Sequence, residues 1–95
     1  MSFFLVTYEY TGDPEAQHQV RPAHRDFLRS LGPTLVVSGP TDARGAALIF
    51  EAVGAAEVET LLDEDPFWKQ GFIGARRVAG WTPVLGRLVE EGVLP

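Results

Sequence analysis

Cysteine is missing from this chain of 95 residues. Its absence excludes disulfides, thiolate metal sites and cysteine nucleophiles, and it agrees with a reducing compartment. Long hydrophobic runs are missing too, since no apolar stretch approaches the roughly 20 residues that span a bilayer. The N-terminus lacks the basic start and small-residue cleavage site of a signal peptide. We therefore expect a soluble, cytoplasmic protein with no membrane partner.

Positive charge is scarce as well. Eight basic residues stand against 13 acidic ones, which gives a formal net charge of −5, and Lys69 is the only lysine. Binding to a nucleic acid backbone depends on lysine and arginine side chains that release counterions. We therefore expect no nucleic acid partner. Some arginines can still lie near an anionic small molecule, and the candidates are Arg21, Arg25, Arg76 and Arg77.

Hydrophobic residues make up 45% of the chain, enough for the core of a single domain over residues 1–95. Hydrophobic periodicity and turn residues predict a strand, a helix, two strands, a helix and a strand. The expected ranges are Phe3 to Tyr10, about Arg21 to Leu31, Leu35 to Ser38, Ala46 to Ala52, Gly54 to Asp65 and Phe72 to Ala79, with a long polar loop between the second and third strands. The tail from Trp81 onward suggests one short helix.

This order predicts an α+β fold of the ferredoxin-like βαββαβ type. With right-handed crossovers, the four strands form an antiparallel sheet, the strands from Phe3 and Ala46 lie in the middle, and both helices cover one face. The uncovered face should still carry large apolar side chains, among them Leu5, Ile73 and Trp81. Because a monomer rarely exposes such a patch, we expect a homodimer in which two sheets pack face to face.

His24 is a polar residue in an apolar pattern. Val20, Phe27 and Leu28 recur at the spacing of one helix face, and His24 falls on that same face. Pro22 fits the first position of a helix, because a backbone N–H at that position has no acceptor within the helix and proline lacks this N–H. His24 is then expected in the first turn.

Asp65 is the second misplaced polar residue. It continues the apolar face of the second helix, and Pro66 after it disfavours helical geometry and marks the helix end. A buried carboxylate needs a partner, and an imidazole can share its proton, so His24 and Asp65 are expected to meet and to act as a general acid and base. The alternative is structural: most lone histidines on apolar stripes bond to backbone, and most Asp-Pro pairs only stop helices.

Other candidate residues carry weaker patterns. Two histidines without cysteine do not form a metal site, and His18 is expected to be a solvated loop residue. Ser38 lacks the pattern of a nucleophile elbow and is a candidate substrate contact, while Gly39 either lets backbone N–H groups approach a ligand or only forms a tight turn. No cofactor motif is visible, so no cofactor is expected.

Four short motifs together resemble the YCII-related (YciI-like) family. They are Phe3-Phe4-Leu5-Val6, Arg21-Pro22-Ala23-His24, Ser38-Gly39-Pro40 and Asp65-Pro66-Phe67 with Gly71. The resemblance covers about Met1 to Trp81 and implies a ferredoxin-like fold of the dimeric α/β-barrel type. It also implies a pocket with a His/Asp pair, which is His24 and Asp65 here, lined by Ser38 and Gly39. The chain departs from the family in its extension, residues 82–95.

The superfamily resembled also contains muconolactone isomerases, which transfer protons on small ring compounds. We therefore expect an isomerase-like or lyase-like enzyme in which Asp65 orients His24. Tyr8 is expected to orient the substrate, and Arg21 or Arg25 to hold a carboxylate. The rival hypothesis is a non-catalytic module that binds a small ligand in its cavity.

Overall fold

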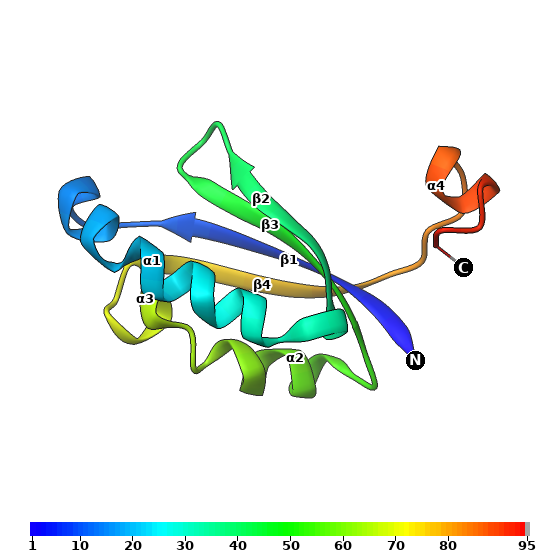
Figure 1. Ribbon diagram of the computed structural model, residues 1–95, viewed down its shortest axis with the longest axis horizontal. Coiled ribbons are helices and arrows are strands. Elements are labelled where there is room, and N and C mark those ends of the chain that lie inside the picture. Colours follow the sequence, from blue (N-terminus) through cyan, green and yellow to red (C-terminus); the bar gives the residue numbers. More distant parts are fainter. Residues whose placement is uncertain (95) are drawn as a thin grey trace.

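The computed structural model describes residues 1–94, so the last residue of the extension 82–95 lies outside the described residues. The six predicted elements are present, and short helical segments are added between and after them (Figure 1). The elements are β1 (Ser2–Tyr10), α1 (Pro14–Ser30), the 3₁₀ turn η1 (Gly32–Thr34), β2 (Leu35–Thr41), β3 (Gly45–Ala52), α2 (Ala55–Leu62), α3 (Pro66–Lys69), β4 (Ile73–Trp81) and α4 (Arg87–Glu90).

The four strands form one antiparallel sheet in the order β2-β3-β1-β4. β1 and β3 are central, as predicted, and α1, α2 and α3 lie on the same face of the sheet (Figure 1). The predicted ferredoxin-like α+β fold is therefore confirmed. None of the helices in residues 1–94 has the length and apolar character needed to cross a membrane.

The core lies between the sheet and the helices. Alternate residues of β1 point toward the helices, and its Val6 is paired with Leu48 of β3 on one side and with Val78 of β4 on the other. Burial of such apolar side chains is the main favourable term in folding. The helices complete the core with three fully or almost fully buried residues, Val58, Leu62 and Phe67.

The first helix begins earlier than predicted. Asp13 caps it by accepting a hydrogen bond from the Glu15 N–H at 3.1 Å, and Pro14 takes the first helical position. Pro22, which we expected there, lies inside the helix on an exposed position, so His24 lies in the middle of α1 and not in its first turn. The polar stretch before it is helical because Gln17 is buried and donates to the Thr11 carbonyl at 2.6 Å.

The second strand is longer than predicted and continues through Ser38-Gly39-Pro40 to Thr41. Ser38 pairs with Leu48 and Gly39 pairs with Ala47, so the expected turn after the strand is part of the strand. Pro40 is tolerated because β2 is an edge strand, where one backbone N–H needs no partner. The loop between β2 and β3 is correspondingly short.

The fourth strand spans Ile73–Trp81, where Phe72 to Ala79 was predicted, and one of its side chains faces the opposite way from prediction. A register shift opposite Glu9 and Tyr10 pairs Ile73 with Tyr10, and Ile73 is buried in the core. It does not join the uncovered face, because the extra residue of the bulge reverses the alternation. The tail then leads away from the sheet (Figure 1). In the tail, Leu85 is exposed, and so is Leu88 within the one-turn helix α4.

We predict that Phe50→Ala lowers the free energy of unfolding by about 3 to 5 kcal/mol, because the ring is fully buried in β3 and its removal leaves a cavity. Val53→Ala is the control: Val53 is 77% exposed just after the same strand, and its truncation should change the stability by about 0.5 kcal/mol or less. Urea unfolding curves of both variants check this. Equal effects of the two substitutions would contradict the described core.

Candidate active site

Asp65 lies at the start of α3 and not at the end of α2, which stops at Leu62. Pro66 keeps Asp65 in an extended conformation, with φ −63° and ψ 126°, and then occupies the first position of the new helix. Asp65 Oδ1 accepts a hydrogen bond from the Phe67 N–H at 2.9 Å. The carboxylate is thus an N-cap, and the cap fixes where its two oxygens point.

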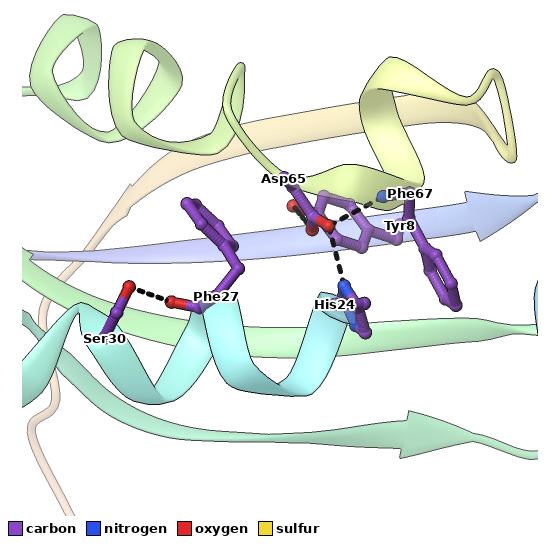
Figure 2. A network of polar contacts seen from close by, with 6 residues as sticks. All are labelled: Tyr8, His24, Phe27, Ser30, Asp65 and Phe67. Atoms are coloured by element: carbon purple, nitrogen blue, oxygen red, sulfur yellow. Dashed lines mark hydrogen bonds and ion pairs between the residues drawn. The ribbon is translucent and has the colours of Figure 1, made fainter. Parts of the chain in front are cut away.

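His24 and Asp65 meet, as expected from their positions in the sequence. Nδ1 of His24, on α1, lies 2.7 Å from Oδ1 of Asp65 (Figure 2). The side chain of Asp65 is fully buried and that of His24 is 9% exposed. Such a short contact away from water orients the imidazole strongly.

Tyr8 supplies the third donor to this carboxylate. Its hydroxyl, from the central strand β1, donates to Oδ2 of Asp65 at 3.3 Å (Figure 2). An ionised carboxylate can only accept hydrogen bonds. With Asp65 ionised, Nδ1 of His24 is the donor in their contact, and Nε2 is the ring nitrogen that Asp65 does not engage.

Phe67 fixes the plane of the histidine ring. The two rings are stacked with centroids 4.1 Å apart and an angle of 2° between their planes. Tyr10 packs edge-on against the same phenyl ring at 5.5 Å. In the sequence analysis Phe67 is named only as part of the motif Asp65-Pro66-Phe67. Its place two residues after Asp65, in the first turn of α3, is the signal that links it to the site.

A pocket of about 430 Å³ lies beside His24, between α1 and the sheet. Six of the seven predicted site residues line it: Tyr8, Arg21, His24, Arg25, Ser38 and Gly39. The seventh, Asp65, is buried behind the imidazole and touches no part of the pocket. Of the remaining lining, Pro40 and Phe67 were named only as members of the family motifs, and Tyr10, Leu28, Ala46 and Leu48 were not predicted as site residues.

The pocket can do acid–base chemistry. Because Nδ1 of His24 is engaged with Asp65, Nε2 is the nitrogen that remains to exchange a proton with a bound molecule. The Tyr8 hydroxyl is directed at Asp65, so this side chain supports the carboxylate and its ring forms part of the wall. Ser38 lines the pocket from β2.

Three residues considered in the sequence analysis lie outside this pocket. Arg76 pairs with Asp63 at 2.8 Å, and its guanidinium stacks on Trp68 at 3.9 Å. Arg77 is exposed on β4 and is absent from the lining as well. His18 lies in α1 and not in a loop, with Nδ1 3.3 Å from Nη1 of Arg21.

Burial raises the pKa of the Tyr8 hydroxyl far above its ordinary value of 10.0, and the negative charge of Asp65 and the hydrogen bond to it raise it further. Each of these factors disfavours a second negative charge beside the carboxylate. Burial, and after it the charge of Asp65, also raises the pKa of Tyr10. Tyr8 therefore remains a donor over the whole physiological pH range.

We predict that the free energy of unfolding falls as the pH rises above 10. Below pH 10 Tyr8 is protonated in both states, whereas above it the unfolded chain loses the proton that the folded chain keeps. Phenolate absorbance and unfolding curves measured between pH 8 and pH 12 check this, and Tyr8→Phe should reduce the fall. Ionisation of both tyrosines with a midpoint near 10 in folded protein would contradict it.

Comparisons with proteins of known structure place these observations in a family. The 5-chloro-2-hydroxyhydroquinone dehydrochlorinase TftG from Burkholderia phenoliruptrix AC1100, solved in complex with 2,5-dihydroxybenzoquinone, is 30% identical. The match covers 84% of this chain and 93% of that chain, with a TM-score of 0.77.

Two proteins from Agrobacterium tumefaciens share the fold at lower identity. One is 18% identical, with 88% of this chain and 94% of that chain covered, and the other, of the NIPSNAP family, is 17% identical, with 86% and 91% covered. Both have a TM-score of 0.57. No curated protein matches the chain. The model of the YCII-related domain matches residues 1–82, and this chain therefore belongs to the YCII-related family.

Proposed function

We propose that this protein is an enzyme that transfers a proton on a small, oxygen-bearing ring compound, with His24 as general base and acid. The observation that carries the proposal is the contact of 2.7 Å between Nδ1 of His24 and the buried carboxylate of Asp65, with the ring at the wall of a pocket. A histidine held in one tautomer by a carboxylate is the usual arrangement of a catalytic base.

In the proposed reaction, Nε2 of His24 accepts a proton from a C–H or O–H group of the substrate. The electron pair left behind either forms a double bond and expels a leaving group with its electrons, or moves to an oxygen until the proton returns at another carbon. The first outcome is an elimination and the second an isomerisation. Asp65 stabilises the imidazolium that forms and does not itself take the proton.

The volume and the lining of the pocket support a ring compound as substrate. Its volume of about 430 Å³ is in the range of small-molecule sites. Tyr10, Leu28 and Phe67 give it apolar walls, and Ser38 adds a hydroxyl. The related dehydrochlorinase, 30% identical, was solved with a planar dihydroxyquinone. That relationship favours an elimination on a hydroxylated ring over other proton transfers.

We predict that the protein releases chloride from 5-chloro-2-hydroxyhydroquinone or a close analogue, and that His24→Gln lowers kcat by about 10² to 10⁴ because the base is lost. Asp65→Asn should lower kcat as well, since an amide can donate to Nδ1 and force the wrong tautomer. Chloride release and incorporation of solvent deuterium into product measure the rates.

The control for these variants is Arg29→Gln, because Arg29 lies on the same helix, is exposed and paired with Asp26, and does not line the pocket, so kcat should be unchanged. Melting temperatures show whether each variant is folded. Turnover by His24→Gln at the rate of the unchanged protein would refute the proposed base. The protein is better described as a non-catalytic binding module if it binds 5-chloro-2-hydroxyhydroquinone or its analogues but neither converts them nor exchanges a proton with them.

We further propose that the protein is a homodimer formed by the face of the sheet opposite the helices. Phe3 and Trp81 are paired in neighbouring strands on this face, as are Leu5 and Ile49. Val37, paired with Ile49 from the other side, is 60% exposed and Trp81 is 38% exposed. An apolar surface of this kind is rarely left in water by a monomer.

We predict a dimer by light scattering at micromolar concentration. Ile49→Lys should shift the population to monomers, because it places a charge in the middle of the proposed contact. Val53→Lys is the control, since Val53 is 77% exposed after the end of β3 and should leave the mass unchanged. A monomeric mass for the unchanged protein would refute the dimer and would leave the chemistry of His24 untested by this experiment, because the two proposals have separate readouts.

A further inference from the structure

The wall of the pocket carries a charge opposite to that of the whole chain. The chain has a formal net charge of −5. The pocket is nevertheless lined by two arginines, Arg21 and Arg25, and none of its lining residues is acidic. Asp65 is fully buried, does not line the pocket and is already bonded to three partners. A molecule in the pocket therefore meets positive charge.

These two arginines also differ from others in their partners. Arg29, Lys69 and Arg76 each form an ion pair with an acidic side chain. Within residues 1–94, Arg21 and Arg25 form no such pair, and the side-chain contact of Arg21 is with the imidazole Nδ1 of His18 at 3.3 Å. Their charges are thus available to a ligand, since guanidinium groups bind carboxylate and other anionic oxygens with two parallel hydrogen bonds.

The positions of Arg21 and Arg25 on α1 place both arginines close in sequence to the proposed base, His24. Arg21 is three residues before His24 and Arg25 is one residue after it, and all three line the same pocket. The spacing of four residues puts both arginines on one side of α1. When Nε2 of His24 removes a proton, negative charge develops on the substrate. A fixed cation in a largely apolar pocket stabilises such charge more than water does.

We infer that the pocket selects anionic substrates, namely small ring compounds that bear a carboxylate or an ionised hydroxyl group, and that Arg21 and Arg25 hold that negative oxygen beside His24. The inference rests on the proposed function only where it calls the bound molecule a substrate. The binding that it predicts can be measured without turnover. A neutral ring of the same size and shape lacks the partner that the two guanidinium groups require.

Two matched pairs of probes test the inference and separate the two sources of negative oxygen. The first pair is 2,5-dihydroxybenzoquinone, whose hydroxyl groups are vinylogous carboxylic acids and are ionised at neutral pH, and neutral 2,5-dimethoxybenzoquinone. The second pair is 2,5-dihydroxybenzoate and its methyl ester. Calorimetry gives Kd for each probe with the full chain at low and at high salt. In at least one pair we expect the anion to bind at least tenfold more tightly, with the preference reduced by salt.

Variants of the two arginines test whether these side chains cause the preference for the anionic probe. Arg21→Gln and Arg25→Gln should each weaken binding of the preferred anion by about tenfold, the scale of one hydrogen bond to a charged group, and the double variant should remove the preference over the neutral probe. Arg29→Gln is the matched control, since Arg29 is exposed on the same helix, paired with Asp26 and absent from this pocket, and its Kd should be unchanged. Melting temperatures confirm that each variant is folded.

The inference is overturned if the unchanged protein binds anionic and neutral probes equally, if it binds none of them, or if the double variant keeps the preference for the anion. These results are distinct from failure of the proposed function. His24→Gln should still bind the anion while losing turnover. Turnover by His24→Gln at the unchanged rate would refute the base, whatever the arginine variants do.

Discussion

The burial of one carboxylate constrains the rest of this structure. Asp65 is fully buried, and removing an ionised carboxylate from water is expensive unless every lone pair finds a donor. Its donors are the imidazole of His24, the hydroxyl of Tyr8 and the N–H of Phe67. They come from α1, β1 and α3, so one polar contact network joins both helical segments to the centre of the sheet. The pocket then forms beside this network, where the imidazole meets the apolar lining.

Much of this arrangement can be predicted from the sequence because it follows from local pattern. The apolar alternation around Val6 specifies a central strand, and the order of elements specifies the sheet. His24 and Asp65 are identifiable for the opposite reason, since each interrupts an apolar pattern. A polar residue at a buried position needs a partner, and the two that needed one are partners of each other.

Two of the remaining features depend on contacts between distant parts of the chain, and a third on a choice between local signals. The Tyr8 hydroxyl reaches a carboxylate 57 residues away, which alternation along β1 does not reveal. The start of α1 is fixed by the Asp13 cap, and Pro22 is a second plausible start that the folded chain does not use. The Ser38-Gly39-Pro40 segment has the composition of a turn, yet pairing with β3 extends it as an edge strand. For Tyr8 and for the β2 segment, contacts with distant residues decide the outcome, whereas the start of α1 is decided between two local helix-start signals.

The double engagement of one Asp65 oxygen bears on how this family diversifies. Oδ1 of Asp65 accepts from both the imidazole of His24 and the N–H that begins α3. The cap on α3 is therefore a structural reason for an aspartate at this position, whether or not the pocket is catalytic. No helix terminus depends on the histidine. Under the proposed function, a relative that keeps the aspartate but lacks the histidine should keep the fold and lose proton transfer.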